Sequence, residues 1–174
     1  MRYLLILFFI ISCSYEKYES SDQPPVAGEC VDGISTYTIN GEDVQFECNG
    51  YDLLGHVSLE QMNAESGNDC WGWTDPLTGK EYALMGLDNG TGIIDISDPF
   101  NPNFLGKIPT ATLSSTWRDI KVYKDHAFIV SEAAGHGMQI FDLSKLRDVT
   151  DVQEFQTDLL YEGYGHSHNI AINT

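Results

Sequence analysis

The sequence predicts an all-β protein, in which a partial β-propeller of about two complete blades and the start of a third follows a short cysteine-containing preamble. The first observation is a repeat: residues 81–98 and 125–144 both lead from a small-plus-apolar run through a Gly-rich turn to an apolar–Asp–apolar–Ser end. The second is its spacing, because the matching Asp95 and Asp142 lie 47 residues apart. A period of roughly 45–50 residues built from short strands is typical of a propeller blade.

The third observation is a partial third copy, since residues 168–172 (HNIAI) resemble residues 118–122 (RDIKV) at a distance of 50 positions. A propeller closes with roughly four to eight blades. Two blades and part of a third would leave sheet edges open to water. We therefore expect the chain to be a fragment of a longer protein, or else to close by forming an oligomer.

The charge is strongly one-sided, with 26 acidic residues against 9 basic ones. No basic stripe is present to displace counterions from phosphate, so the sequence predicts no nucleic-acid partner. Acidic surfaces keep exported proteins soluble, and that interpretation competes with cation binding.

The amino terminus has the features of an export signal. Met1-Arg2 precedes an apolar run over residues 3–11, which is far shorter than the roughly 20 residues needed to span a bilayer. The run ends in Ile-Ile-Ser-Cys13, which resembles a bacterial lipobox, so we expect Cys13 to be acylated. This predicts an exported protein of the bacterial cell envelope, as an outer membrane lipoprotein attached to the membrane through its lipid. An ordinary signal peptide cut nearby is the alternative.

The residues after Cys13 lack apolar periodicity and are rich in Ser, acidic residues and Pro, which is typical of a flexible tether. The chain is therefore expected to divide into a signal peptide, an acylated tether, a disulfide-containing preamble and the incomplete repeats, over residues 1–12, 13–29, 30–66 and 67–174.

The preamble contains a predicted hairpin. Two short strands, residues 35–39 and 44–46, surround an Asn-Gly turn, and Cys30 and Cys48 flank them. Because export permits disulfides, we expect a Cys30–Cys48 bridge, which would contribute about 3 kcal/mol. Cys70 is then left over, either buried or paired with a cysteine beyond residue 174.

Each complete repeat is expected to supply four strands separated by turn residues. The strands of the first repeat are predicted over residues 70–74, 81–87, 92–96 and 104–108, and those of the second over residues 118–123, 127–132, 138–143 and 153–156. A helical turn is expected over residues 143–147. Asp95, Asp98 and Asp142 are expected to close turns by accepting backbone N–H groups, with metal binding as the alternative.

The inner strand of each blade lines the channel of a propeller, and ligands usually bind at its mouth. Aligning the copies places Trp71, Arg118 and His168 at one position and Gly72, Asp119 and Asn169 at the next. Ionisable and polar groups there are candidates for ligand binding, namely Arg118, Asp119, His168 and Asn169. Structural ion pairs of Arg118 and Asp119 that hold neighbouring blades together are the alternative.

The best metal candidate is the pair of histidines in the third copy. His166 and His168 lie two residues apart, so on a strand they would face the same side. With His136 or Glu132 from a neighbouring loop they would hold a divalent cation, the only cofactor that the sequence suggests. The alternative is that His168 bonds to the channel backbone and His166 is exposed.

Three long segments carry a family resemblance: NDCWGWTDPLTGKEYALMGLDNGTGIIDISDPFNPNFLGKIPT, SSTWRDIKVYKDHAFIVSEAAGHGMQIFDLSKLRDVT and YGHSHNIAINT. Over roughly residues 28–174 the chain resembles the choice-of-anchor B family, bacterial surface or secreted proteins with LVIVD-type propeller repeats. The resemblance implies a propeller, a variable means of attachment to the envelope and a full length much greater than this chain. Cys70 departs from the family's usual pattern. The family has no established catalytic activity.

Two functions follow from these expectations. The first is a lipid-anchored, exported propeller that serves as a surface binding or scaffolding module for an extracellular protein, a glycan or a small molecule. The second is an exported metal-dependent propeller hydrolase, similar to a lactonase, with a cation at the mouth of its channel.

Overall fold

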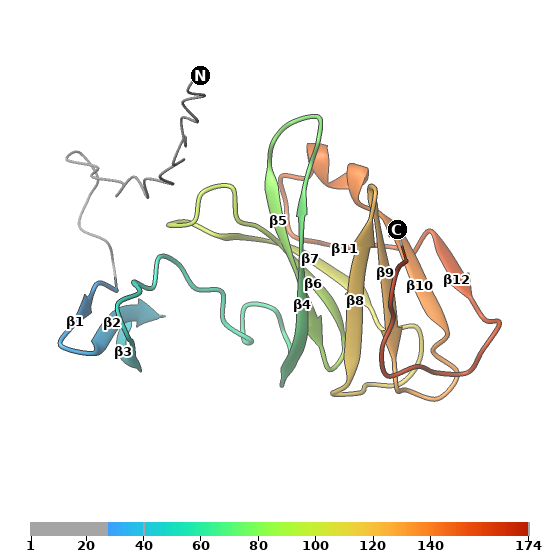
Figure 1. Ribbon diagram of the computed structural model, residues 1–174, viewed down its shortest axis with the longest axis horizontal. Helices are drawn as coiled ribbons and strands as arrows, with labels where there is room; N and C mark the ends of the chain where they lie inside the picture. Colours follow the sequence, from blue (N-terminus) through green and yellow to red (C-terminus); the bar gives the residue numbers. More distant parts are fainter. Residues whose placement is uncertain (1–27, 40, 174) are drawn as a thin grey trace, which may run out of the picture.

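The computed structural model describes residues 28–39 and 41–173, and they form three β-sheets and one short 3₁₀-helix (Figure 1). The mostly β fold expected from the sequence is confirmed. A small three-stranded sheet lies beside two larger sheets, and the described residues form no closed ring of sheets. The predicted signal peptide, Cys13 and nearly all of the tether lie outside the described residues.

The small sheet is the expected preamble hairpin with one added strand. It consists of β1 (Cys30–Val31), β2 (Ile34–Ile39) and β3 (Glu42–Glu47), all antiparallel. The predicted Cys30–Cys48 disulfide is present, with the two Cα atoms 5.9 Å apart. Cys70 is exposed and forms no disulfide within the described residues, so the first of the two alternatives for it, a buried thiol, is wrong.

The five-stranded sheet contains the first repeat. Its strands β4 (Gly67–Thr74), β5 (Glu81–Leu87), β6 (Gly90–Asp95) and β7 (Asn103–Pro109) pair in sequence order as an antiparallel meander. The fifth strand comes from the second repeat: β11 (Gln153–Glu154) pairs parallel to β7.

The position of β11 corrects one expectation, because this segment was expected to be the last strand of the second repeat. Gly106 on β7 explains the pairing. Its φ of +133° is open to glycine, and a Cβ there would overlap the Gln153 backbone. The missing side chain therefore gives β11 its place at the edge of the first sheet.

The four-stranded sheet contains the second repeat, as β8 (Arg118–Tyr123), β9 (His126–Ser131), β10 (Met138–Asp142) and β12 (Leu159–Tyr161). The 3₁₀-helix η1 (Leu143–Asp148) follows β10, where a helical turn was expected. The fourth strand is thus β12, which the sequence did not indicate.

The third copy does not form a strand in the described structure. Residues 168–172 lie instead along the second sheet, where backbone hydrogen bonds hold the segment at Ser167 and Ile170. Ser167 donates its N–H to the Ser131 carbonyl at 3.0 Å, and Ile170 donates its N–H to Asp119 Oδ2 at 2.7 Å.

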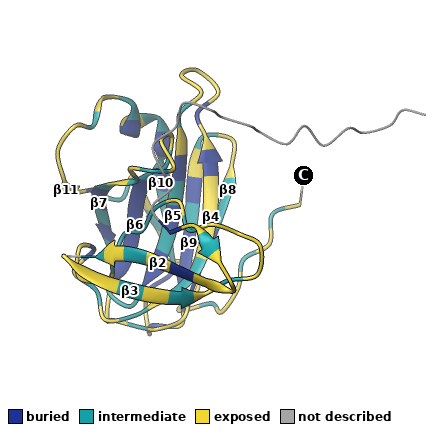
Figure 2. Cartoon of the chain, turned by 90° about the vertical axis from the view of Figure 1, so that its left-hand side faces the viewer, coloured by how far each residue is buried: buried dark blue, intermediate teal, exposed yellow. Residues whose placement is uncertain are grey.

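The alternation of side chains along β5 builds two apolar clusters. Tyr82 and Leu84 point into the core between the two larger sheets, where they meet Ile120 and Phe141 of the second repeat. The residues of β5 with the opposite orientation (Ala83, Met85 and Leu87) belong to a smaller cluster around Met62 on the other face. Burying each large side chain stabilises the fold by about 1.5–3 kcal/mol. Figure 2 shows the buried positions concentrated in the larger sheets, whereas β2 and β3 are mostly exposed.

The two repeats are also joined by an ion pair between a buried carboxylate and a partly buried arginine. Arg147 of η1 donates from Nε and Nη2 to the two carboxylate oxygens of Asp75, at 2.8 Å each. Asp75 is fully buried in the turn between β4 and β5. The hydrogen bond from Arg147 holds the pKa of Asp75 far below its usual range.

The Asp–Xaa–Ser ends of the repeats close turns, as predicted. Asp95 accepts the Ser97 N–H at 3.0 Å and the Ser97 hydroxyl at 2.6 Å. Asp142 accepts the same two groups of Ser144 at 3.0 and 2.7 Å, which caps η1. Asp98 likewise accepts the Phe100 N–H at 3.0 Å.

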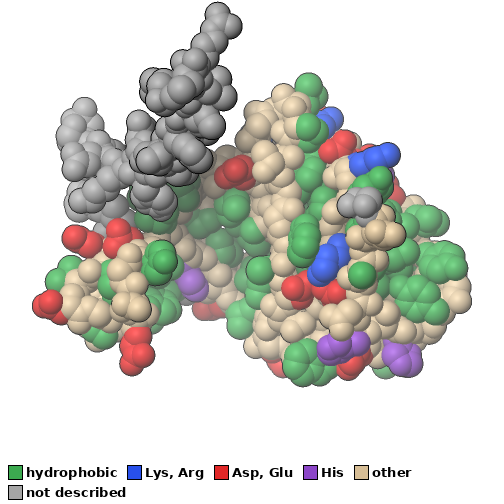
Figure 3. All heavy atoms as spheres, in the orientation of Figure 1, with side chains coloured by type: hydrophobic (Ala, Val, Ile, Leu, Met, Phe, Trp, Pro, Cys, Tyr) green, Lys and Arg blue, Asp and Glu red, His purple; other side chains and the backbone are tan. Residues whose placement is uncertain are grey.

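Acidic side chains are spread over both the small sheet and the larger sheets on the face drawn in Figure 3. Within the described part of the chain, no helix has the length and apolar character needed to cross a bilayer.

Candidate ligand-binding site

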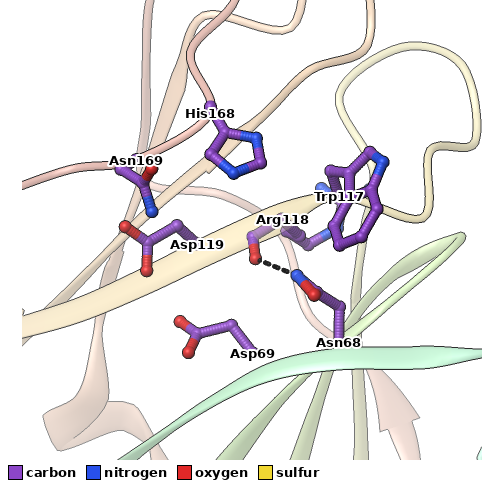
Figure 4. A pocket seen from close by; sticks show the side chains of 7 residues that line it. All are labelled: Asn68, Asp69, Trp117, Arg118, Asp119, His168 and Asn169. Carbon is purple, nitrogen blue, oxygen red and sulfur yellow. Dashed lines mark hydrogen bonds between the residues drawn. The ribbon is translucent and has the colours of Figure 1, made fainter.

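A polar pocket of about 230 Å³ lies where β4 and β8 begin (Figure 4). The segment that contains the third copy forms its opposite wall. The pocket is lined by Asn68, Asp69, Trp117, Arg118, Asp119, His168 and Asn169. All four residues that the sequence suggested for ligand binding therefore border the same pocket.

Three copies of the repeat contribute equivalent positions to this pocket. Residues 168–169 lie 50 positions after residues 118–119, and these in turn lie 50 positions after Asn68 and Asp69. Strand pairing agrees, because Cys70 pairs with Met85 as Ile120 pairs with Ile129. The site is thus built from the same two positions of successive repeats.

The expected alignment of Trp71 with Arg118 is wrong by three residues. It used the 47-residue step between Asp95 and Asp142, but the turn between the first two strands is longer in the first repeat. Eight residues separate the paired Trp73 and Tyr82, whereas two separate the paired Tyr123 and His126. In the structure Trp71 corresponds to Lys121.

Asp69 and Asp119 each hold the backbone of the next repeat. Asp69 Oδ2 accepts the N–H of Ile120 at 2.8 Å, and Asp119 Oδ2 accepts the N–H of Ile170 at 2.7 Å. Both bonds span 51 residues. Each of the two repeats therefore attaches the segment that follows it by the same aspartate-to-backbone hydrogen bond.

Lys121 lies between the two carboxylates. Its Nζ is 2.5 Å from Asp119 Oδ1, 3.7 Å from Asp69 Oδ2 and 4.5 Å from the centre of the Trp71 ring. Burial acts to raise the pKa of Asp119. The hydrogen bonds from Lys121 and from the Ile170 N–H outweigh that effect, and the pKa lies below its usual value.

Arg118 lines the pocket with its backbone, while its side chain is buried with 1% of its surface exposed. Nε donates to the Leu87 carbonyl at 2.9 Å, and Nη1 is 2.9 Å from His136 Nε2. Burial lowers the pKa of Arg118 to about 10, so it remains a cation at neutral pH. Arg118 and Asp119 form no ion pair with each other; Arg118 joins the repeats through Leu87, and Asp119 pairs with Lys121.

The contact with Arg118 determines which ring nitrogen of His136 carries the proton. Because a guanidinium only donates, Nε2 of His136 must accept, and Nδ1–H then donates to the Gly137 carbonyl at 3.2 Å. Burial, and then the nearby Arg118 charge, lower the pKa of His136. His136 is therefore a neutral part of the core that supports Arg118.

Trp117 and His168 form the open side of the pocket. Trp117 is half exposed, and its ring centre lies 5.9 Å from that of His168. His168 Nδ1 is 2.6 Å from Glu132 Oε1, which leaves Nε2 without a hydrogen bond to the described residues.

The four metal candidates do not converge. His168 and Glu132 are in contact, but His136 is buried against Arg118 and His166 is exposed. Over residues 28–39 and 41–173 no group of three or more His, Cys, Asp and Glu side chains is placed to hold a metal ion.

Sequence reasoning missed Asn68, Asp69 and Trp117. The signal for the first two was available, since the 50-residue step that relates 118 to 168 also leads back to 68. Trp117 precedes Arg118 directly but has no aromatic counterpart in the other copies, at Gly67 or at Ser167. Comparisons of the chain with protein-family models, with curated proteins and with solved structures found no match.

Proposed function

We propose that the chain is part of a lipid-anchored, exported β-propeller of the choice-of-anchor B type, which acts as a cell-surface binding module. The observation that carries the proposal is the pocket, because three successive repeats contribute the same two positions to it. A site assembled in this way is what the channel mouth of a propeller requires, since each blade adds its inner strand to a common centre.

The links between repeats support a series of blades. β4 of the first repeat lies next to β8 of the second, and Asn68 Nδ2 donates to the Arg118 carbonyl at 2.8 Å. The Asp69–Ile120 and Asp119–Ile170 bonds repeat at the same spacing. A further inner strand beginning near residue 168 would continue this pattern.

The side-chain chemistry favours binding over catalysis. Both oxygens of Asp119 are occupied by Lys121 and by the Ile170 N–H, and the Arg118 guanidinium faces the core. The hydrolase alternative has only His168 and Glu132 in contact among its four candidate ligands. The groups left available to a ligand are the Trp117 ring, the side chain of Asn169 and free atoms of Asn68, Asp69 and His168.

The anchoring part of the proposal rests on the Ile-Ile-Ser-Cys13 motif and the tether that follows it. An acylated Cys13 would hold the protein at the outer membrane, with the pocket presented to extracellular proteins, glycans or small molecules. Stable attachment would use the diacyl or triacyl group of a lipoprotein, because one acyl chain binds only marginally.

Metabolic labelling with radioactive palmitate tests the proposal. The chain is produced in a bacterium from its first codon, and the label is followed in membrane fractions of wild type, Cys13→Ala and Cys70→Ala. Wild type and Cys70→Ala should carry the label in the membrane, and external protease should digest them on intact cells. An unlabelled wild type, or a label that persists in Cys13→Ala, would contradict the anchor.

A further inference from the structure

We infer that the pocket of three repeats binds a neutral carbohydrate, with one sugar ring lying against Trp117 and its hydroxyl groups bonded by Asn68, Asp69 and Asn169. The inference rests on the proposed binding function and specifies its ligand. The cavity of about 230 Å³ is smaller than most ligand pockets, which suits a single ring of a chain that continues into solvent.

Trp117 provides the apolar platform. Its side chain is 50% exposed although it borders a polar cavity. Its backbone is fixed, because the Trp117 carbonyl accepts the Ser131 hydroxyl at 3.1 Å and the Glu132 N–H at 3.2 Å. The C–H face of a sugar ring packs well on such an indole, which offers a large apolar area at small entropic cost.

Two polar side chains of the pocket, those of Asn68 and Asp69, are held in place with part of their bonding capacity free. The amide of Asn68 is fixed by the Arg118 carbonyl, which leaves its Oδ1 available. Asp69 uses Oδ2 for the Ile120 N–H and keeps Oδ1. The Asn169 side chain faces the same space in Figure 4 and adds both a donor and an acceptor. Hydroxyl groups both donate and accept, so they match this mixed set, and the prior fixing lowers the cost of binding.

The charge of the site argues for a neutral ligand. Asp69 and Asp119 share Lys121, so these three side chains leave one excess negative charge. The chain as a whole carries a net charge of −17, which repels anions. A metal ion would need more converging ligands than the described residues offer.

Saturation-transfer NMR on the whole exported chain tests the inference. The probes are methyl glycosides of glucose, galactose, mannose and N-acetylglucosamine, with tetramethylammonium as a cationic probe. Wild type is compared with Trp117→Ala and Asn169→Ala, and with Tyr51→Ala as a matched control, because Tyr51 is an exposed aromatic residue outside the pocket. Trp117→Phe keeps an aromatic face and checks that loss of binding is not loss of folding.

We expect at least one glycoside to bind wild type, Tyr51→Ala and Trp117→Phe. Its dissociation constant should rise roughly tenfold in Trp117→Ala and in Asn169→Ala. No glycoside signal, equal signals in Trp117→Ala and wild type, or a signal for tetramethylammonium alone would overturn the carbohydrate assignment. Palmitate labelling of Cys13 is independent of these results, so a failed sugar test with successful labelling removes the ligand and leaves the anchor.

Discussion

Arg118 and Asp119 are adjacent on β8, yet they do different things because successive side chains of a strand face opposite sides. Arg118 enters the core and ties its strand to the Leu87 carbonyl of the first repeat. Asp119 faces away and binds Ile170 in the segment that follows. Arg118 thus binds the preceding repeat and Asp119 binds the segment that follows, so this pair connects three copies of the repeat.

Replacing Asp119 by Asn tests the link from β8 to Ile170 in the segment that follows. The variant loses the charge that pairs with Lys121, and its side chain has one acceptor where the carboxylate has two. We expect the free energy of unfolding to fall by about 1–3 kcal/mol, as for other hydrogen bonds to charged groups. Urea unfolding measures the change. Asp148→Asn is the control, since the exposed Asp148 makes no hydrogen bond or ion pair in the described structure, and an equal loss there would refute the role of Asp119.

His136 should make stability depend on pH. Its pKa in the folded protein is lowered by burial and by Arg118, whereas the unfolded chain titrates near its ordinary value of about 6.5. Below that value the unfolded chain binds a proton that the folded protein still excludes, so stability is lost as the pH falls towards the folded pKa. Urea unfolding at several pH values should show this slope. The slope should flatten in His136→Gln, and identical slopes would contradict the assignment.

At the scale of elements, the sequence predicted strands well and their partners less well. Residues 81–87 and 118–123 form β5 and β8 with the expected bounds. Apolar runs and turn residues are local features, and they mark where a strand begins and ends. The partner of a strand depends on distant residues. The clearest case is β11, which was found near the expected residues but in the other repeat's sheet.

The same difference between local features and contacts to distant residues explains which residues of the site the sequence predicted. The residues at 118, 119, 168 and 169 were found from one repeat step, and all four line the pocket. Asn68 and Asp69 were missed because the repeats differ in the length of the turn after their first strand, so the step measured at Asp95 and Asp142 does not apply to β4 and β8. The direction of the Arg118 side chain depends on its burial between the repeats, which no pattern within one repeat specifies.

Gly106→Ala tests why β11 joins the first sheet. A methyl group at Gly106 would overlap the Gln153 backbone, and its φ of +133° disfavours alanine. We expect β11 to detach, so that the Phe155 N–H loses the Lys107 carbonyl that it now bonds at 2.9 Å. Hydrogen exchange at Phe155 should become fast. Gly72→Ala is the control on β4, because its Cβ would meet nothing closer than 3.9 Å, and equal exchange in both variants would refute the explanation.

At the scale of the whole molecule, the small sheet is an independent part. Neither apolar cluster includes a residue of β1, β2 or β3, and most of their side chains are exposed. Fewer buried contacts imply that this sheet opens at lower cost than the larger ones. The Cys30–Cys48 disulfide supplies stability that the packing does not.

Removing the disulfide should therefore affect the small sheet alone. In the double variant Cys30→Ser, Cys48→Ser we expect the local stability of β1–β3 to fall by about 3 kcal/mol. Hydrogen exchange followed by mass spectrometry should show faster exchange there and no change in β5 or β9. Cys70→Ser, at an exposed free thiol, should match wild type. Faster exchange throughout the larger sheets would show that the small sheet supports them.

The pairing of β11 with β7 also has a consequence for the order in which the emerging chain folds. The first sheet reaches its five-stranded form only after residues 153–154 have emerged, well after β7. In that interval about 44 further residues must emerge, from the end of β7 at Pro109 to Gln153. Throughout it, the edge of β7 is open to pairing with another nascent chain. A chaperone that shields strand edges would raise the yield of this protein most during that interval.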